Sequence, residues 1–195
     1  TLDEFAQEIA LTFESQGNDL QNITWQGDLT VTTNPDITRG HTIRTSSDIG
    51  HQHRITGSQY NDRITTGEGD DILIGGRGDD LLIGGAGSDT YLFRVGDGND
   101  IIHTKNNSMS DLDTIRFEEI ASSDVTYKPS GQDLVIHYSA HDSVRIEDFF
   151  SQNNWGNPEV AWLQNKVSYF EFSDRTLTLD EFAQEIALTF ESQGN

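Results

Sequence analysis

The sequence predicts an all-β dominated fold: a parallel β-roll, or β-helix, followed by an antiparallel β region, with short flanking α-helices. Three observations lead to this prediction. Glycine-rich nonapeptides fill residues 57–103, strand-like alternation of apolar and polar residues marks 104–178, and an amphipathic helical pattern occupies 179–195. About a quarter of the residues are Leu, Ile, Val or Phe, so the chain can bury a core.

The nonapeptides are the strongest repeat signal. Three consecutive copies read TGEGDDILI (66–74), GGRGDDLLI (75–83) and GGAGSDTYL (84–92). A fourth, VGDGNDIIH (95–103), follows two inserted residues, and a degenerate copy, GSQYNDRIT (57–65), precedes them in register. Eleven of the 18 glycines lie in this stretch, which indicates a structural motif instead of a flexible linker.

Each nonapeptide has two halves with different physical roles. The first six residues are rich in Gly, which permits positive φ and close backbone approach, so this half can turn tightly. The last three residues form a short strand in which one side chain points inward. One turn and one strand make half a coil. Two nonapeptides therefore complete one turn of a parallel β-helix, and every second copy stacks on the same side.

This stacking brings the sixth-position aspartates together. We expect Asp62 over Asp80 and Asp71 over Asp89, while Asp80 lies under Asp100, where the two inserted residues lengthen the spacing. Stacked carboxylates repel one another unless a cation lies between them. Two carboxylates and several turn carbonyls supply about six oxygen ligands, which suits Ca²⁺. Mg²⁺ fits less well, because it retains its waters and needs near-octahedral geometry.

The nonapeptides resemble the RTX (repeats-in-toxin) calcium-binding motif G-G-x-G-x-D-x-U-x. The resemblance implies two to four Ca²⁺ ions. The side-chain ligands that it implies are Asp62, Asp71, Asp80, Asp89 and Asp100. The backbone carbonyl ligands that it implies are Gly67, Gly69, Gly76, Gly78, Gly85, Gly87, Gly96 and Gly98. Tyr60 replaces a turn glycine and His53 occupies the preceding Asp position, so the first site departs from the motif and we expect the roll to weaken there.

Residues 104–178 resemble the haemolysin-type calcium-binding-protein-related region that follows RTX repeats. The segments that carry this resemblance are DLDTIRFEEI, DVTYKPSGQDLVIHY, DSVRIEDFF and VSYFEFSDRTLT. Strands are expected near 114–117, 125–128, 133–138, 143–146 and 167–172, with a hairpin at Ser130-Gly131. Residues 19–50 resemble no named family, and we expect an N-terminal β segment over 19–56.

The segment TLDEFAQEIALTFESQGN occurs twice without change, at residues 1–18 and 178–195. Thr178 and Glu181 form a capping box ahead of an apolar stripe, which predicts a helix over 179–195. The copy at 1–18 is expected to be the C-terminal helix of a preceding unit. We therefore interpret the chain as one unit of a tandem array, with neighbouring units as partners, although a cloning duplication or a permuted arrangement would leave the same pattern.

The composition excludes several classes of function. Asp and Glu number 33 against 12 Lys and Arg, and the net charge of −21 argues against a nucleic-acid partner, which needs a basic face. The sequence contains no Cys, which rules out disulfides and zinc–thiolate sites. It has no apolar run long enough to span a bilayer and so no predicted transmembrane segment.

Together these observations predict a calcium-binding structural module of a secreted bacterial tandem-repeat protein, a toxin or adhesin. The resemblance implies type I secretion and an extracellular or cell-surface location, where external calcium would fold the chain. The alternative is a carbohydrate- or peptide-binding module attached to a secreted enzyme, suggested by Trp155 and Trp162 around Gly156-Asn157-Pro158. The chain lacks H-E-x-x-H and G-x-S-x-G motifs, and we do not expect it to be an enzyme.

Overall fold

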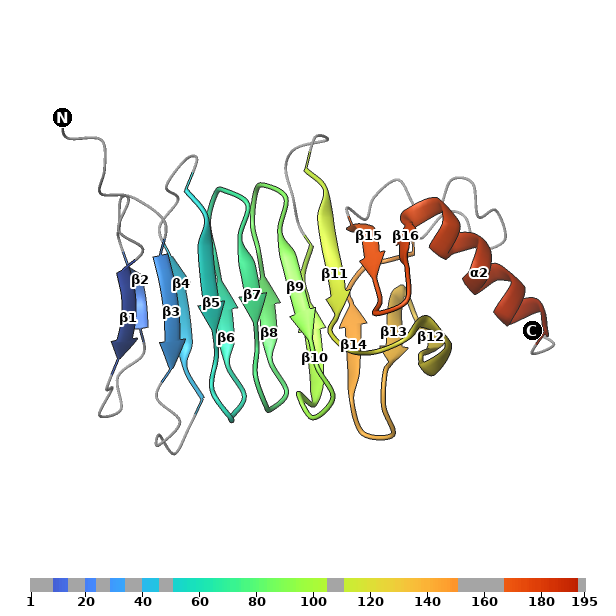
Figure 1. Cartoon of the computed structure of the whole chain (residues 1–195), viewed down its shortest axis with the longest axis horizontal. Helices are drawn as coiled ribbons and strands as arrows, with labels where there is room; N and C mark the ends of the chain where they lie inside the picture. Colours follow the sequence, from blue (N-terminus) through green and yellow to red (C-terminus); the bar gives the residue numbers. More distant parts are fainter. Residues whose placement is uncertain are drawn as a thin grey trace.

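The computed structural model describes residues 9–13, 20–23, 29–33, 40–45, 51–104, 111–150 and 167–192, with side chains from residue 40 to 189 within these ranges. Two eight-stranded sheets face each other, and their strands stack along the long axis (Figure 1). One sheet contains, in spatial order, β1 (Ile9–Phe13), β3 (Leu29–Thr33), β5 (His53–Thr56), β7 (Ile72–Ile74), β9 (Thr90–Phe93), β11 (Asp113–Phe117), β15 (Val167–Glu171) and β16 (Thr176–Thr178). The other contains β12 (Thr126–Ser130), β13 (Asp133–His137), β14 (Ser143–Ile146), β10 (Asn99–Ile102), β8 (Leu81–Ile83), β6 (Arg63–Thr65), β4 (Thr42–Thr45) and β2 (Leu20–Ile23). The 3₁₀ helix η1 (Ser122–Asp124) and the helix α2 (Leu179–Ser192) complete the described elements.

The nonapeptide strands form the predicted parallel roll. Consecutive strands alternate between the sheets, and each pairs in parallel with the strand two further along: Ile64 lies opposite Leu82, and Leu73 opposite Tyr91. These four middle residues are fully buried. The inward side chain therefore recurs once per nonapeptide, as the three-residue strand requires.

The roll extends further toward the N-terminus than the sequence indicated. β5 pairs in parallel with β3 and β7, and β4 pairs in parallel with β2 and β6, so the expected weakening at His53 does not interrupt the sheets. The physical reason lies in the strand half of the repeat. Ile43 and Ile55 still point inward and are fully buried, so the core continues where the turn signature is lost.

The strands expected after the roll are all present within two residues of their predicted positions, but they are only partly antiparallel. β14 pairs in parallel with β10, and β11 pairs in parallel with both β9 and β15, so these strands continue the roll. The antiparallel pairs are β12–β13, β13–β14 and β15–β16. Gly131, with a φ of +65°, makes the predicted hairpin turn between β12 and β13.

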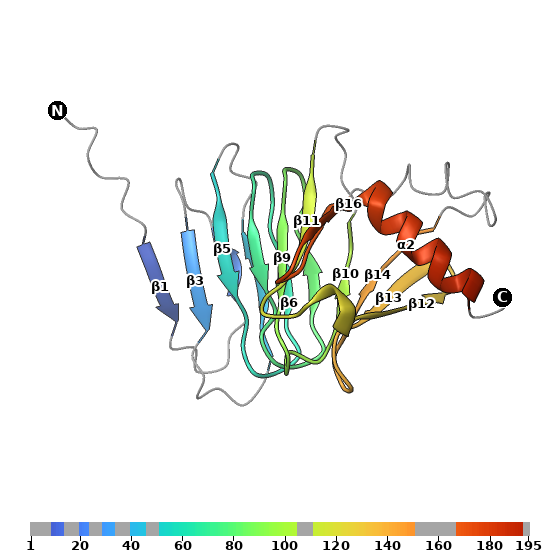
Figure 2. The same ribbon diagram turned by 45° about the vertical axis from the view of Figure 1, so that its right-hand side comes forward.

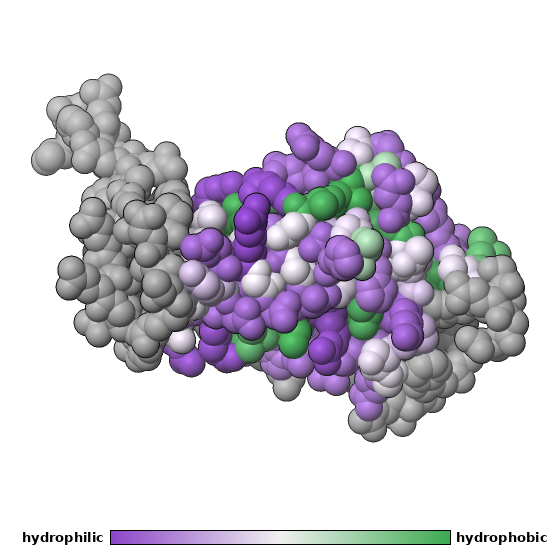
Figure 3. Space-filling view, turned by 90° about the horizontal axis from the view of Figure 1, so that it is seen from below, coloured by the Kyte–Doolittle hydropathy of each residue, from purple (hydrophilic) through white to green (hydrophobic). Residues whose placement is uncertain are grey.

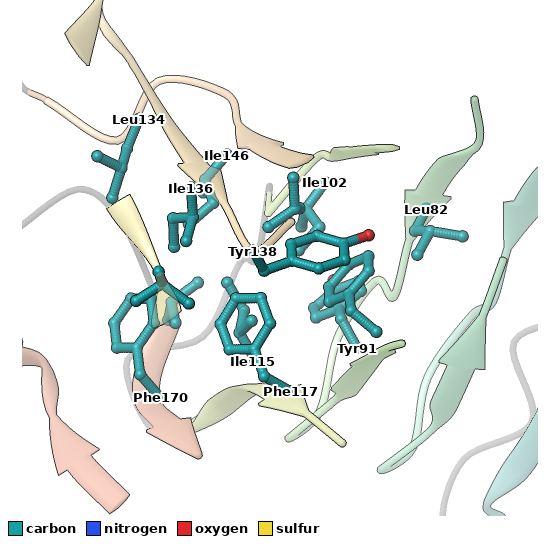
Figure 4. Close-up of a cluster of buried hydrophobic side chains, with 14 of the residues drawn as sticks. Leu82, Tyr91, Ile102, Ile115, Phe117, Leu134, Ile136, Tyr138, Ile146 and Phe170 are labelled. Atoms are coloured by element: carbon teal, nitrogen blue, oxygen red, sulfur yellow. The ribbon is translucent and has the colours of Figure 1, made fainter. Parts of the chain in front are cut away.

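The core becomes aromatic at the C-terminal end of the roll. Ile102 and Ile146 from one sheet and Ile115 and Phe117 from the other converge around Tyr138 (Figure 4). The rings of Phe117 and Tyr138 lie 5.5 Å apart. The rings of Phe117 and Tyr138 thus pack together where the antiparallel strands join the roll.

α2 covers the C-terminal end of the roll (Figure 2). The ring of Phe182 stacks on Phe170 with centroids 3.6 Å apart, and Tyr127 meets it edge-on at 5.0 Å. The predicted capping box is confirmed, because the Glu181 carboxylate accepts the Thr178 backbone N–H at 2.8 Å. None of the described residues forms a helix that could cross a membrane.

The N-terminal copy of the repeated segment differs from our expectation. Residues Ile9–Phe13 form strand β1, parallel to β3, where we expected a helix, and residues 1–8 and 14–18 lie outside the described residues. The local sequence is the same in both copies, so the neighbours decide the structure. α2 rests on β15 and β16, whereas Ile9–Phe13 lie beside the edge of β3.

Candidate metal sites

The turns of the roll form two rows at opposite edges of the molecule. The strands of the two sheets run in opposite directions, so the turn after β7 lies at one edge and the turn after β8 at the other (Figure 1). The row at the lower edge of Figure 1 contains the turns that end at Asp62, Asp80 and Asp100. The row at the upper edge contains the turns that end at Asp71 and Asp89. Seen from below, the molecule is largely hydrophilic with separate apolar patches (Figure 3).

The sixth-position aspartates form a hydrogen-bonded ladder in each row. In the lower row, Oδ1 of Asp80 accepts the backbone N–H of Asp62 at 2.7 Å, and Oδ1 of Asp100 accepts that of Asp80 at 2.9 Å. In the upper row, Oδ1 of Asp89 accepts the N–H of Asp71 at 3.0 Å. The predicted stacking is therefore present, and each carboxylate is held by the backbone of the preceding coil.

The second carboxylate oxygen behaves differently. Oδ2 of Asp71, Asp80, Asp89 and Asp100 is buried and has no hydrogen-bond partner among the described residues. A buried carboxylate oxygen without a partner is costly, and such atoms in a native fold call for a ligand. Asp62 is the exception among the five predicted ligands, because its Oδ2 accepts the backbone N–H of Ser58.

Burial changes the protonation of these carboxylates. Desolvation raises the pKa of Asp80 to about 7, with the charge of Asp62 adding to the effect. Desolvation and the charge of Asp113 raise the pKa of Asp89 to about 8, and desolvation with the charge of Asp80 raises that of Asp100 to about 8. Without a cation, the rows therefore resist full ionisation near neutral pH.

The first glycine of the nonapeptide makes room for the unpartnered oxygen. A Cβ added at Gly75 would lie 2.2 Å from Oδ2 of Asp80, and one at Gly84 would lie 2.0 Å from Oδ2 of Asp89. Fourth-position glycines face a different constraint. Gly87 has a φ of +118°, and an added Cβ would lie 2.2 Å from the carbonyl oxygen of Gly69 in the neighbouring coil. Adjacent turns thus stack backbone against backbone.

Two of the predicted carbonyl ligands are hydrogen-bonded to the backbone. The Gly67 carbonyl accepts the N–H of Ala86 at 2.9 Å, and the Gly98 carbonyl accepts that of Ser143 at 2.9 Å. A carbonyl has two lone pairs, so these bonds leave room for a second interaction. No three carboxylate or imidazole groups of the described residues gather into a metal site. The carboxylates would therefore need turn carbonyls to complete a coordination shell.

The sequence prediction missed Asp113. This residue is fully buried, and its Oδ1 accepts the backbone N–H of Asp89 at 3.0 Å, so it extends the upper ladder by one coil. Asp113 lies 24 residues after Asp89 instead of 18, so a search at the spacing of the repeat does not find it. The signal that could have found it is the segment Asp-Thr-Ile-Arg, an Asp two residues before an inward apolar side chain, as in each nonapeptide.

A second ladder, formed by fifth-position side chains, was also missed. Oδ1 of Asn61 accepts the N–H of Asp79 at 3.0 Å, and Oδ1 of Asp79 accepts the N–H of Asn99 at 3.0 Å. In the other row, Oδ1 of Asp70 accepts the N–H of Ser88 at 2.7 Å. These side chains accept the N–H groups of the following coil, whereas the sixth-position aspartates accept the N–H groups of the preceding coil. The carboxylates of Asp70 and Asp79 therefore have a structural role that is separate from metal binding.

Histidines begin both sixth-position ladders. His53 donates its backbone N–H to Oδ1 of Asp71 at 2.7 Å, and its Nδ1 lies 3.0 Å from the same oxygen. His41 takes the equivalent position over Asp62, where its backbone N–H donates to Oδ1. The rows of aspartates thus end at imidazoles on the N-terminal side.

These features define the class of protein: a parallel β-roll whose coils stack acidic, glycine-rich turns around buried carboxylates, the donor set that a hard cation such as Ca²⁺ prefers. Residues 56–91 match the family model of the RTX calcium-binding nonapeptide repeat, in four copies. The chain therefore carries RTX calcium-binding repeats, as predicted. No curated protein matches the chain. The family match ends before residue 104, so the resemblance of 104–178 to the haemolysin-related region stays a prediction.

Proposed function

We propose that this chain is a calcium-binding structural module of a secreted bacterial tandem-repeat protein, a toxin or adhesin, which folds on binding Ca²⁺ after export. The observation that carries the proposal is that Oδ2 of four sixth-position aspartates is buried and has no hydrogen-bond partner in the described part of the chain, on a chain of net charge −21. The RTX repeat is a calcium-binding structural repeat, and we propose no catalytic activity.

The proposed ligands follow the two ladders. In the upper row, Ca²⁺ would lie between the turns of Asp71 and Asp89 and between those of Asp89 and Asp113. In the lower row, it would lie between the turns of Asp80 and Asp100. The carbonyl ligands in this proposal remain those of Gly67, Gly69, Gly76, Gly78, Gly85, Gly87, Gly96 and Gly98. Three ions fall within the two to four expected, and Asp62 is left as a hydrogen-bonded end of the row.

The energetics link ion binding to folding. Folding without Ca²⁺ would desolvate several carboxylates of like charge, which opposes compaction. Calcium supplies positive charge to these oxygens when it is bound. Because the ion binds only the folded coils, its binding free energy adds to the free energy of unfolding. A low-calcium cytosol would keep the chain extended for export, and millimolar external calcium would fold it.

Circular dichroism of the full chain during titration with CaCl₂, with MgCl₂ and EDTA as comparisons, tests the proposal. We expect strand signal to appear with Ca²⁺ and to be lost in EDTA. Asp80→Asn should raise the calcium requirement. Asp79→Asn is the matched control, because it makes the same charge change in the same turn and keeps an oxygen for the Asn99 N–H. A chain equally folded in EDTA would contradict the proposal.

The alternative function has no support from the described part of the chain. Trp155 and Trp162, which suggested a carbohydrate- or peptide-binding loop, lie outside the described residues. The tandem array is part of the proposal and rests on the identical segments at 1–18 and 178–195.

A further inference from the structure

Asp142 links the antiparallel β13–β14 hairpin to the last turn of the lower row, which is the turn that ends at Asp100. It lies in the turn between β13 and β14, which sits beside the turn between β9 and β10 at the lower edge of Figure 1. Its Oδ2 accepts the backbone N–H of Gly96 at 2.9 Å, and its Oδ1 accepts that of Gly98 at 3.0 Å. Ser139 donates its hydroxyl to Oδ2. One carboxylate therefore holds two N–H groups of the 95–100 turn.

In earlier turns, the N–H of the fourth-position glycine donates to a backbone carbonyl of the next stacked turn. The fourth-position N–H of Gly69 donates to the carbonyl of Ala86 at 2.9 Å, and that of Gly78 donates to the carbonyl of Asp97 at 2.8 Å. In both cases the acceptor is the third residue of the next stacked turn. Gly98 is the fourth residue of the last nonapeptide, and Asp142 supplies the acceptor in place of a next turn.

The β13–β14 turn replaces the missing coil in other ways too. The Ser143 N–H donates to the Gly98 carbonyl at 2.9 Å, and the Ser143 hydroxyl donates to Oδ1 of Asn99 at 2.8 Å. The second bond continues the fifth-position ladder. β14 then pairs in parallel with β10, with Asn99 opposite Ser143. The hairpin thus presents the last nonapeptide with the contacts of a further coil.

We propose that Asp142 is a positioning residue for the lower-row calcium site between the turns of Asp80 and Asp100. Both of its oxygens are used by N–H groups, so it acts through the turn and not as a ligand. By fixing Gly96 and Gly98 it sets the backbone of the turn that carries Asp100. This inference rests on the proposed function, and it makes the hairpin region part of the calcium site.

The test is a double-mutant cycle on the full chain, with calcium affinity and ion number measured by isothermal titration calorimetry. Asp142→Ala should weaken one site roughly tenfold, the effect of losing hydrogen bonds to a charged acceptor, and leave the other sites unchanged. In the Asp80→Asn background, where that site is already lost, Asp142→Ala should cause little further change in calcium affinity or ion number. In the Asp89→Asn background, which alters only the upper row, it should have its full effect.

An equal effect of Asp142→Ala in both backgrounds, or no effect in either, would overturn the inference. Asp142→Asn keeps one acceptor oxygen and should give an intermediate loss at the same site, so it serves if the Ala variant does not fold. Asp124→Asn, an exposed change of the same charge, is the control. If the unaltered chain shows no calcium response, or if Asp80→Asn and Asp89→Asn leave that response unchanged, the proposed function fails first; if only the cycle is additive, only this inference fails.

Discussion

The carboxylate of Asp113 accepts the backbone N–H of Asp89 at 3.0 Å, one coil beyond the last residue of the RTX match. The upper row of carboxylates therefore continues into the region after the nonapeptides. Asp113 also adds negative charge beside Asp89 and is the largest electrostatic cause of its raised pKa.

Asp113→Asn should consequently remove or weaken one calcium site. The amide keeps an oxygen for the Asp89 N–H but loses the charge that would attract the ion. We expect isothermal titration calorimetry to show one ion fewer, or one site weakened at least about tenfold. Asp124→Asn makes the same charge change at an exposed position and should leave the isotherm unchanged. An unaltered ion count and affinity in Asp113→Asn would show that the upper row ends at Asp89.

Gly84→Ala should damage the site for steric reasons alone. The added methyl group would lie 2.0 Å from Oδ2 of Asp89 and 2.7 Å from the Tyr91 hydroxyl, both buried. Overpacking of this kind typically costs about 1–3 kcal/mol. We expect a higher calcium midpoint in circular dichroism. Gly96→Ala is a useful comparison, since no atom of the described residues lies within 4 Å of its Cβ position, whereas its φ of +98° strains the backbone of any residue but glycine. A larger effect at Gly96 than at Gly84 would contradict the steric argument.

Stability in EDTA should fall as the pH rises from about 4 to about 8. The carboxyl groups of Asp80, Asp89 and Asp100 have an ordinary pKa of 3.8 in the unfolded chain and pKa values of about 7 to 8 in the folded chain. In this window the folded chain binds more protons than the unfolded chain, so protonation favours folding and is lost at higher pH. Circular dichroism of the chain in EDTA at pH 5 and at pH 8 measures this directly, because more strand signal should remain at pH 5 than at pH 8.

In calcium the trend should reverse, because protons compete with Ca²⁺ for the same oxygens. Calcium affinity should drop on acidification through pH 8 to 5. The Asp89→Asn variant should show a smaller pH dependence in EDTA than the unaltered chain. A metal-free chain that is more stable at pH 8 than at pH 5 would refute the burial of ionisable carboxylates on which this prediction depends.

Phe182→Ala should destabilise the C-terminal end of the fold. Its ring is fully buried between Phe170 and Tyr127. Removing a buried Phe ring costs about 3–5 kcal/mol. Urea unfolding in saturating calcium should show this loss. Leu188→Ala lies on the same helix but is 67% exposed, and it should change the free energy of unfolding by less than about 0.5 kcal/mol. Equal effects of the two variants would mean that α2 does not cap the roll.

Much of the repeat could be predicted because its information is local. Each nonapeptide contains its own turn glycines, its own Asp and its own inward residue, so the two sheets and the stacking of Asp80 under Asp100 follow from spacing alone. The strands after residue 104 were also predictable from alternation. Their mixed pairing was not, because nothing within β14 distinguishes a partner in β13 from one in β10.

The missed features depend on distant parts of the chain. Asp113 follows an irregular spacing, and Asp142 meets Gly98 across 44 residues. The fifth-position ladder uses Asn, Asp and Ser interchangeably, so no single residue type marks it. The helix expected at 1–18 illustrates the same limit, because one sequence forms α2 beside β15 and a strand, β1, beside β3.

Because successive nonapeptides alternate between the two sheets, the roll can lengthen or shorten cleanly only by even numbers of repeats. Deleting 75–83 alone would carry every later turn to the opposite edge, and Asp89 would then stack on Asp62 in place of Asp71. Deleting 66–83 would preserve the edge of each remaining turn and the pairing of the last turn with the Asp142 hairpin. Insertions and deletions in this roll must therefore preserve whether the number of nonapeptides is odd or even, and the total length matters less. The smallest duplication that does so is 18 residues, which is two nonapeptides.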